Sequence, residues 1–152
     1  GFDAVVNERA NRMSWPQGQM RYNLATVAEL RTFRPIPYVL ELDGETLQTE
    51  AMLVAVGNGP SFGGGLRICE GALLDDGLLD VVVITRMSKT RLVRSYPRLF
   101  TGNIDGVHEY VHHRVAKATV AAPGIVAYAD GERFGPLPLT VECAAGALEV
   151  FA

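Results

Sequence analysis

The feature that most constrains the fold is a change in the spacing of apolar residues just after Pro37. Beyond it, apolar and polar side chains alternate, as at Tyr38, Leu40 and Leu42. Such alternation is typical of β-strands with one buried face. Asp-Gly pairs, which favour tight hairpin turns, then recur at Asp43-Gly44, Asp76-Gly77 and Asp130-Gly131. The sequence therefore predicts a mainly β fold for this part of the chain.

The expected elements form one domain over residues 1–152, with a helical segment at about 3–33 and strands from about 37 to 152. Apolar spacing predicts helices at 3–13 and 19–33 and strands that include 38–42, 46–56, 66–69 and 79–85. A further helix is predicted at 89–100, with Pro97 as a kink or early stop. Strand spacing does not follow the strand–helix alternation of parallel sheets. The fold class is therefore α+β and mainly β, a β-sandwich with helices at one end.

Composition excludes several classes of protein. The chain has 152 residues, 48% of them hydrophobic, which is enough apolar material for one packed core. Its apolar runs are far shorter than the roughly 20 residues of a bilayer-spanning helix. The formal net charge of −3 is opposite in sign to that of a nucleic-acid-binding surface. Two cysteines are sparse usage, which fits a reducing cytosol.

Two motifs look like known sites but lack what those sites need. The glycine-rich stretch 57–65 contains Pro60 and leads into a predicted strand, whereas a phosphate-binding glycine loop opens a helix. Residues 108–112 spell H-E-x-x-H, but a strand places His108 and His112 about 13 Å apart, too far for one zinc ion. We expect a tight loop at the first motif and no metalloprotease chemistry at the second.

Two turns carry carboxylates, and each has two interpretations. Asp75, Asp76 and Gly77 form either an ordinary hairpin turn or a site for a hard cation such as Mg²⁺, which prefers carboxylate and carbonyl oxygens. Glu132, directly after the last Asp-Gly pair, is either a solvated turn residue or a general base that faces a cleft.

The predicted helix at 89–100 has a basic face. Arg91, Arg94 and Arg98 lie on one side at helical spacing, opposite Leu92. This face is either solvated or docked on anionic lipid headgroups.

Four segments in register carry a family resemblance. They read GFDAVVNERAN at the start, then VAVGNGPSFGGGLRICEGALLDDGLLDVVVI, then a basic helix ending PRLFTG, then YADGE. Together they resemble the C-terminal half of bacterial diacylglycerol kinase-type lipid kinases, actinobacterial ones above all, within the NAD kinase and lipid kinase superfamily. The resemblance implies a C-terminal β-sandwich domain that closes a cleft against an N-terminal nucleotide-binding domain.

We expect that N-terminal domain to be absent from this chain. Its Gly-Gly-Asp-Gly-Thr nucleotide loop does not occur in the 152 residues, and Gly1-Phe2-Asp3 at the start lack an initiator Met. The expectation is therefore a piece of a longer polypeptide, inactive alone, with ATP bound mainly by the missing domain.

The resemblance also implies site residues. In the LDDGLL motif the family binds Mg²⁺ through one aspartate and two main-chain carbonyls, which match Asp76 and the carbonyls of Leu73 and Leu78, with Asp75 as a water-mediated contributor. In the DGE motif the general base matches Glu132. It would take the proton from the primary hydroxyl of diacylglycerol as that oxygen attacks the γ-phosphorus of ATP, giving phosphatidic acid.

Partners and location follow from the same resemblance. Expected partners are diacylglycerol or a related lipid, the N-terminal domain and an anionic membrane surface, with a homodimer as an option and no nucleic acid. The expected location is cytoplasmic, peripheral to the inner face of the cell membrane, with Trp15 and Phe33 as candidates to line an acyl-chain groove. Sphingosine, ceramide and NAD are alternative acceptors. A non-catalytic, metal-stabilised sandwich that binds lipid or protein is the alternative of a different class.

Overall fold

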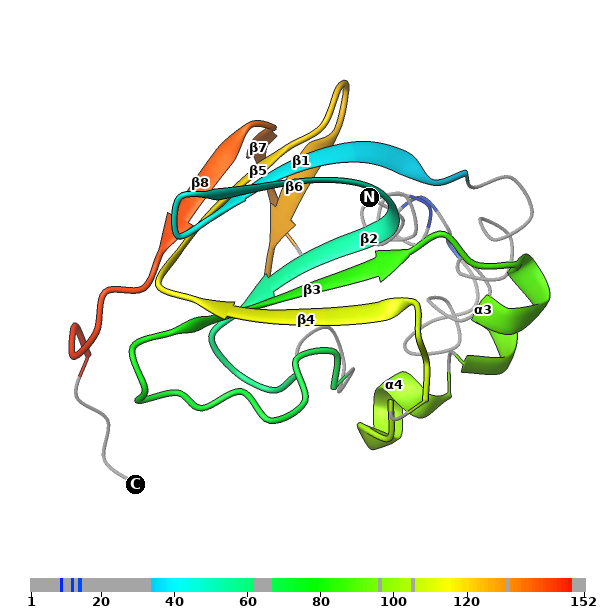
Figure 1. The fold of residues 1–152 in the computed structure, drawn as a ribbon, viewed down its shortest axis with the longest axis horizontal. Coiled ribbons are helices and arrows are strands. Elements are labelled where there is room, and N and C mark those ends of the chain that lie inside the picture. The colour runs from blue at the N-terminus through cyan, green and yellow to red at the C-terminus, as the bar shows by residue number, and fades with distance from the viewer. Residues whose placement is uncertain are drawn as a thin grey trace.

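A computed structural model describes residues 9, 12, 14, 34–61, 67–95, 97–104, 106–130 and 132–148. In chain order the elements are β1 (Ile36–Leu42), β2 (Glu45–Gly57), β3 (Leu79–Thr85), α3 (Lys89–Ser95), α4 (Arg98–Thr101), β4 (Tyr110–Val115), β5 (Lys117–Ala121), β6 (Val126–Ala129), β7 (Glu132–Pro136) and β8 (Leu139–Glu142). Six strands form an antiparallel sheet in the order β4-β3-β2-β1-β5-β8, and β6 and β7 form a second, two-stranded sheet (Figure 1).

The β1–β2 hairpin is closed by the Asp-Gly turn that the sequence predicts. Leu42 pairs with Glu45, so the loop holds only Asp43 and Gly44. Both have positive φ, 48° and 92°, which is the conformation that Asp-Gly tolerates in a two-residue hairpin loop. The turn prediction is confirmed.

Strand β3 is buried on both of its faces, which explains the apolar run from Val81 to Ile84. Val82 and Ile84 pack with Ile68, Cys69 and other side chains in one core cluster. On the opposite face, the odd-numbered valines of β3 pack with side chains of β1 and β5 in a second cluster, whose members are Tyr38, Leu40, Leu42, Ala51, Val81, Val83, Val115, Ala118 and Val120. The central sheet therefore needs a covering layer on each face.

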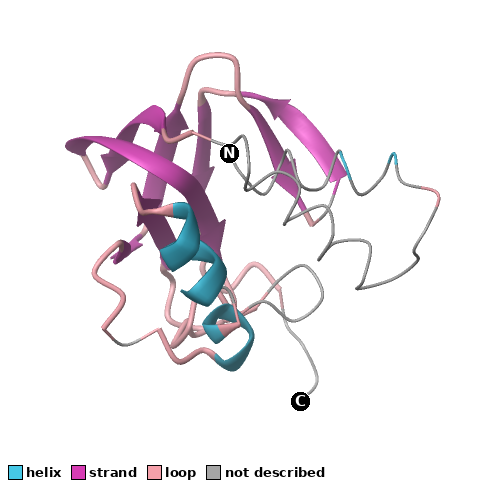
Figure 2. Ribbon diagram, turned by 90° about the vertical axis from the view of Figure 1, so that its right-hand side faces the viewer, coloured by secondary structure: helices cyan, strands magenta, loops and turns pink. Residues whose placement is uncertain are grey.

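Those layers come from different parts of the chain. Ile68, Cys69 and Ala72 of the β2–β3 loop and Leu92 of α3 cover the first face. The two-stranded β6–β7 sheet stands to one side of the six-stranded sheet (Figure 2), and Leu137, which follows β7, packs against the second cluster. The predicted fold class, mainly β with a sandwich-like arrangement and helices at one end, is confirmed.

The helix predicted at 89–100 is confirmed in position, but Pro97 divides it into two helices. Helix α3 ends at Ser95, and α4 begins at Arg98 with Pro97 as its N-cap residue. Proline lacks the N–H that a continuous helix would need at this position. Both helices lie where β3 ends and β4 begins (Figure 1).

Two other predictions have different outcomes. The strand expected at 66–69 is wrong: residues 68–71 form a turn, in which the Ala72 N–H donates to the Cys69 carbonyl at 3.0 Å. Of the helical segment expected at 3–33, almost all lies outside the described residues, and so do Trp15 and Phe33. In the part of the chain that is described, no helix is both long and apolar enough to cross a membrane.

Candidate functional site

Asp76 lies in the loop that leads directly into β3, on the face covered by that loop. Its Oδ1 accepts a hydrogen bond from the Leu78 N–H at 2.9 Å, and the residue between them, Gly77, has a φ of 74°. The turn does not close a tight hairpin, because it lies within the long loop 58–78 that connects β2 to its antiparallel partner β3. The interpretation as an ordinary hairpin turn is therefore wrong. The turn places the Asp76 carboxylate beside the first residues of β3.

A charge network that reaches a buried aspartate begins at this carboxylate. Asp76 forms an ion pair with Arg114 of β4. Arg114 also lies 3.8 Å from Asp80 Oδ1, measured from its Nε, and His112 Nε2 lies 2.6 Å from the same oxygen. The register of β3 and β4 produces this arrangement, because Asp80 pairs with Arg114 and Val82 pairs with His112. Arg114 thus joins the loop carboxylate to the strand carboxylate.

Asp80 has no exposed surface. Burying a carboxylate is costly unless it is paired and hydrogen-bonded. Its Oδ1 meets this condition through His112 and Arg114, whereas its Oδ2 is buried without a hydrogen-bond partner among the described residues. Among the described residues, therefore, only one of the two carboxylate oxygens of Asp80 has partners.

The neighbouring thiol and phenol stay protonated. Burial and, to a smaller extent, the negative charge of Asp80 together raise the pKa of the Cys69 thiol to about 11. Burial, then the charges of Cys69, Asp80 and Glu70, also raise the pKa of Tyr110. As a protonated donor, the Tyr110 hydroxyl bonds to the Ile68 carbonyl at 2.5 Å and fixes the loop to β4.

The glycine that ends β2 makes room for this packing. A Cβ atom at Gly57 would lie 2.9 Å from Cys69 Sγ, closer than carbon and sulfur can approach. The tight-loop prediction at 57–65 is therefore supported at its first residue, and residues 62–66 lie outside the described chain.

The donors around Asp76 match a hard cation in chemistry. A carboxylate and main-chain carbonyls are ligands that Mg²⁺ prefers, and Oδ1 keeps a lone pair beyond its bond to Leu78. Among the described residues, no group of three or more His, Cys, Asp or Glu side chains could hold a metal. The predicted site does not need such a group, because its ligands are one carboxylate and two main-chain carbonyls. Arg114 is a competing cation at Oδ2. The Mg²⁺ site at Asp76, Leu73 and Leu78 stays a prediction.

Glu132 is the first residue of β7 and pairs with Ala129 of β6 across a tight turn. Asp130 at that turn has a φ of 49°, and Glu132 is exposed. The six-stranded sheet carries the charge network, whereas Glu132 belongs to the two-stranded sheet, so the structure does not bring Glu132 and Asp76 onto one sheet. Its role as a general base also stays a prediction.

The H-E-x-x-H stretch is not helical, as expected. His108 and Glu109 form a turn before β4, and His112 lies within β4. Glu109 pairs with Arg91 at 3.0 Å, and His112 contacts Asp80. Glu109 and His112 therefore have separate partners, and neither partner is shared between them.

Sequence reasoning assigned no role to Arg114 or His112 and left Asp80 as a neighbour of the acidic turn. A signal for Asp80 exists, because it is the single charge within the apolar strand LDVVVIT. No local signal marks its two partners, which reach it only through strand pairing.

An antiparallel sheet with an apolar core cluster on each face, accompanied by a second, two-stranded sheet, is typical of the β-sandwich-like class of domain. The chain belongs to the family described as the YegS C-terminal NAD kinase beta sandwich-like domain, which matches residues 1–152.

Named relatives agree with this family. The chain is 44% identical over 151 residues to "Diacylglycerol kinase" of Mycobacterium tuberculosis (strain H37Rv), covering 99% of this chain and 49% of that protein. It is 30% identical over 83 residues to "Probable lipid kinase YegS-like" of Citrobacter koseri, covering 53% of this chain and 27% of that protein. The chain thus spans about half the length of the mycobacterial relative.

A solved structure shares the fold. The crystal structure of a diacylglycerol kinase from Bacillus anthracis superimposes with a TM-score of 0.62 at 22% identity, covering 82% of this chain and 43% of that one. The mycobacterial relative is named as a diacylglycerol kinase and the Citrobacter relative as a probable lipid kinase.

Proposed function

We propose that the chain is the C-terminal half of a lipid kinase that transfers the γ-phosphate of ATP to the primary hydroxyl of diacylglycerol, giving phosphatidic acid and ADP. The observation that carries this proposal is the 44% identity to a protein named diacylglycerol kinase over nearly the whole chain. Under this proposal, ATP is bound mainly by an N-terminal domain, and the chain alone is inactive.

Glu132 is assigned the role of general base. Its carboxylate accepts the proton of the lipid hydroxyl while that oxygen forms a bond to the γ-phosphorus. The bond from the γ-phosphorus to the oxygen bridging it to the β-phosphate breaks, and ADP leaves. The exposure of Glu132 at the end of a hairpin supports this role, because a base must be reachable by the hydroxyl it deprotonates.

Asp76 and the carbonyls of Leu73 and Leu78 are assigned to Mg²⁺. When bound, the ion supplies positive charge and favours oxygen ligands. Arg114 holds the Asp76 carboxylate beside β3 through its contact with Asp80, so the loop is oriented by the sheet. This contact with the sheet supports the assignment of the cation to the loop.

The proposed location is cytoplasmic, at the inner face of the membrane. It is supported by the arginines of α3 and α4, since Arg91, Arg94 and Arg98 are exposed. Clustered basic residues attract anionic lipid surfaces.

The acceptor is tested by incubating the intact protein with labelled ATP and, separately, dioleoylglycerol, sphingosine, ceramide and NAD. We expect label in the dioleoylglycerol product alone. Label in sphingosine, ceramide or NAD in its place would keep the kinase class and overturn the acceptor. No transfer to any of the four would favour a non-catalytic lipid-binding or protein-binding domain.

A further inference from the structure

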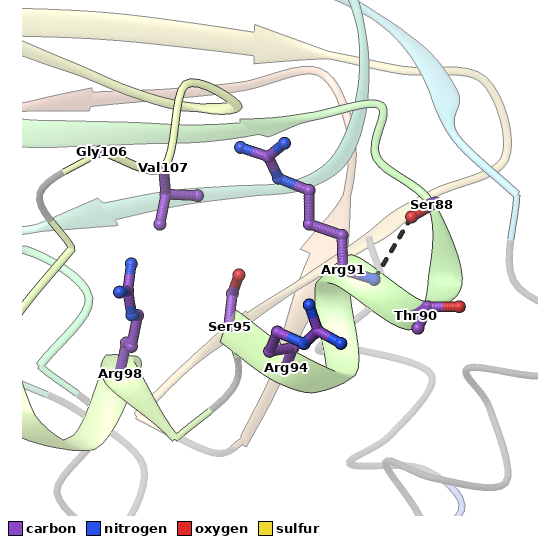
Figure 3. Close-up of a pocket in the computed structure, with 8 residues that line it drawn as sticks. All are labelled: Ser88, Thr90, Arg91, Arg94, Ser95, Arg98, Gly106 and Val107. Atoms are coloured by element: carbon purple, nitrogen blue, oxygen red, sulfur yellow. Dashed lines mark hydrogen bonds between the residues drawn. The ribbon is translucent and has the colours of Figure 1, made fainter.

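Charged side chains gather beyond both ends of β3. After the strand, the arginines of α3 and α4, Arg91, Arg94 and Arg98, line a cavity of about 400 Å³ (Figure 3). Beside its first residues, Asp76 of the preceding loop contacts Arg114 of β4. The seven residues of β3 keep the two places roughly 20 Å apart, so salt screens the charges of one from the other. At the Asp76 end, a positive charge of the protein itself already pairs with the carboxylate that is assigned above to Mg²⁺.

The two oxygens of the Asp76 carboxylate are held by different groups. Oδ1 accepts the Leu78 N–H at 2.9 Å, a bond within the loop itself. Oδ2 is paired with the guanidinium of Arg114, which comes from the sheet. Because the backbone bond at Oδ1 orients the carboxylate without help from Arg114, loss of the arginine contact would free Oδ2 and leave that orientation in place.

A divalent cation and the Arg114 guanidinium repel each other at this carboxylate. Both are positive, and charges of one sign that lie a few ångströms apart cost energy unless water screens them. Screening is incomplete here, since the Asp76 side chain is only 17% exposed. A cation that binds Asp76 therefore has to displace Arg114 or bind less tightly.

Asp80 offers Arg114 a second position. Its carboxylate is fully buried, and His112 Nε2 lies 2.6 Å from Oδ1, whereas no described residue hydrogen-bonds to Oδ2. Arg114 Nε is 3.8 Å from Oδ1, which is longer than a hydrogen bond. A movement of about 1 Å toward Asp80 would give the guanidinium a charge-assisted bond, and it would bring a donor to a buried carboxylate that needs one.

We propose that Arg114 is a tethered counter-ion, which a divalent cation displaces from Asp76 onto Asp80. The exchange leaves neither carboxylate unpaired. Without the cation, Arg114 neutralises Asp76; with it, the cation neutralises Asp76 and Arg114 pairs with Asp80. Arg114 therefore holds the loop when no cation is bound and lowers the affinity of the loop for the cation. This inference rests on the proposed function only for the position of the cation.

The test measures Mg²⁺ binding to the intact protein by isothermal titration calorimetry, without ATP, which would itself bind the ion. Binding heat that is absent in Asp76→Asn identifies the site. We expect Arg114→Gln to bind Mg²⁺ about fivefold more tightly than the wild-type protein, because the competing charge is gone. If Arg114 only supported the loop, its removal would weaken binding, so the two roles predict opposite signs.

Two controls separate the charge of Arg114 from its packing. Arg86→Gln removes a positive charge from an exposed side chain that lies 3.8 Å from Glu50, and its Mg²⁺ affinity should stay near that of the wild-type protein. Arg114→Lys keeps a positive charge but loses the forked geometry. Its affinity should stay closer to that of the wild-type protein than to that of Arg114→Gln.

A crystal structure of the wild-type protein with Mg²⁺ tests the exchange without a substitution, and it decides the proposal even if Arg114→Gln fails to fold. We expect the guanidinium to lie within hydrogen-bond distance of Asp80 Oδ2 and to have left Asp76. An arginine still paired with Asp76 beside the bound ion would overturn the proposal, and so would equal or weaker Mg²⁺ binding by Arg114→Gln.

Failure of this inference is distinguishable from failure of the proposed function. Equal binding of Mg²⁺ by the wild-type protein and Arg114→Gln overturns the role of Arg114 and leaves the metal assignment intact. An absence of binding at Asp76 in both proteins overturns the exchange together with the metal assignment. Because ATP and lipid are not in the experiment, a protein that does not phosphorylate diacylglycerol would give the same binding result.

Discussion

Asp80 shows how one residue organises the loop, the sheet and the proposed metal position. Its buried carboxylate holds His112 and Arg114 from β4, and Arg114 in turn holds Asp76. Removing a partner from such a network costs more than the isolated contact would suggest, because a charge is then left buried and unpaired. The loop geometry at Asp76 therefore depends on residues of two strands.

Magnesium should stabilise the protein through Asp76. At ten times its dissociation constant, Mg²⁺ adds about 1.4 kcal/mol to the free energy of unfolding by mass action. For a chain of this size we expect a rise in melting temperature of about 3–5 °C. Calorimetry with and without Mg²⁺ measures this difference, which should vanish in Asp76→Asn.

The matched control for Asp76 is Glu50→Gln, which alters an exposed carboxylate that lies 3.8 Å from Arg86. It should keep the Mg²⁺-dependent shift. An equal shift in Asp76→Asn and in the wild-type protein would remove Asp76 from the metal site.

Alkaline pH should destabilise the fold through Cys69. Its folded pKa is about 11 against 9 for an ordinary thiol, so above pH 9 the unfolded chain loses a proton that the folded chain keeps. The free energy of unfolding is unaffected by this group below pH 9 and falls as the pH rises toward 11. Between pH 9 and 10 we expect a loss of up to about 1 kcal/mol, measured by urea denaturation.

Cys69→Ala should flatten that pH dependence, and Cys143→Ala should leave it in place. Tyr38 and Tyr110, whose pKa values burial raises above the ordinary value of 10, add a smaller part of the slope as the pH approaches 10. A slope between pH 9 and 10 that is as steep in Cys69→Ala as in the wild-type protein would contradict the assignment.

At the scale of elements, two turns are tied together by one side chain. The Asp43 carboxylate of the β1–β2 turn accepts the backbone N–H groups of Ala116 and Lys117 at 3.1 and 2.8 Å, between β4 and β5. Asp43 also adopts a left-handed conformation that alanine resists. Asp43→Ala should therefore lower the free energy of unfolding by about 2 kcal/mol, measured by urea denaturation.

Asp43→Asn should cost less, because asparagine tolerates the left-handed conformation and keeps one acceptor oxygen. Glu45→Ala, an exposed change in the same hairpin, should stay within about 0.5 kcal/mol of the wild type. The account of the turn is wrong if Asp43→Ala is no more destabilised than Glu45→Ala.

The sequence predicts elements well where their determinants are local. Asp43 and Gly44 mark a turn by their own backbone preferences, and Pro97 divides a helix by lacking a donor. The strand predicted at 66–69 is wrong for a physical reason. Ile68 and Cys69 are apolar because they cover the sheet as part of a turn, and a buried turn can have the same apolar composition as a buried strand.

The candidate site divides in the same way. The acidic turn at Asp76 is visible in the sequence, since an Asp-Gly pair and neighbouring carboxylates lie within four residues. Arg114 and His112 are more than thirty residues away, and only the register of β3 with β4 brings them to Asp80. The basic face of α3 and α4 is an intermediate case, because helical spacing predicts that face but not the ion pair between Arg91 and Glu109.

At the scale of the whole molecule, the chain spans about half the length of its mycobacterial relative. The alignment with the mycobacterial diacylglycerol kinase includes 99% of this chain but only 49% of that protein. Under the proposed function, the sandwich contributes a base and a cation-holding loop, and phosphoryl transfer needs them positioned against a bound nucleotide.

The most direct test of this account is transfer of labelled phosphate from ATP to dioleoylglycerol by the intact protein and two single variants. Glu132→Gln removes the proposed base, and Glu142→Gln alters an exposed glutamate of β8 that pairs with Lys117. We predict that Glu132→Gln lowers kcat by about 10²–10⁴-fold while Glu142→Gln stays near the wild-type rate. A Glu132→Gln variant as active as the wild type would contradict the account.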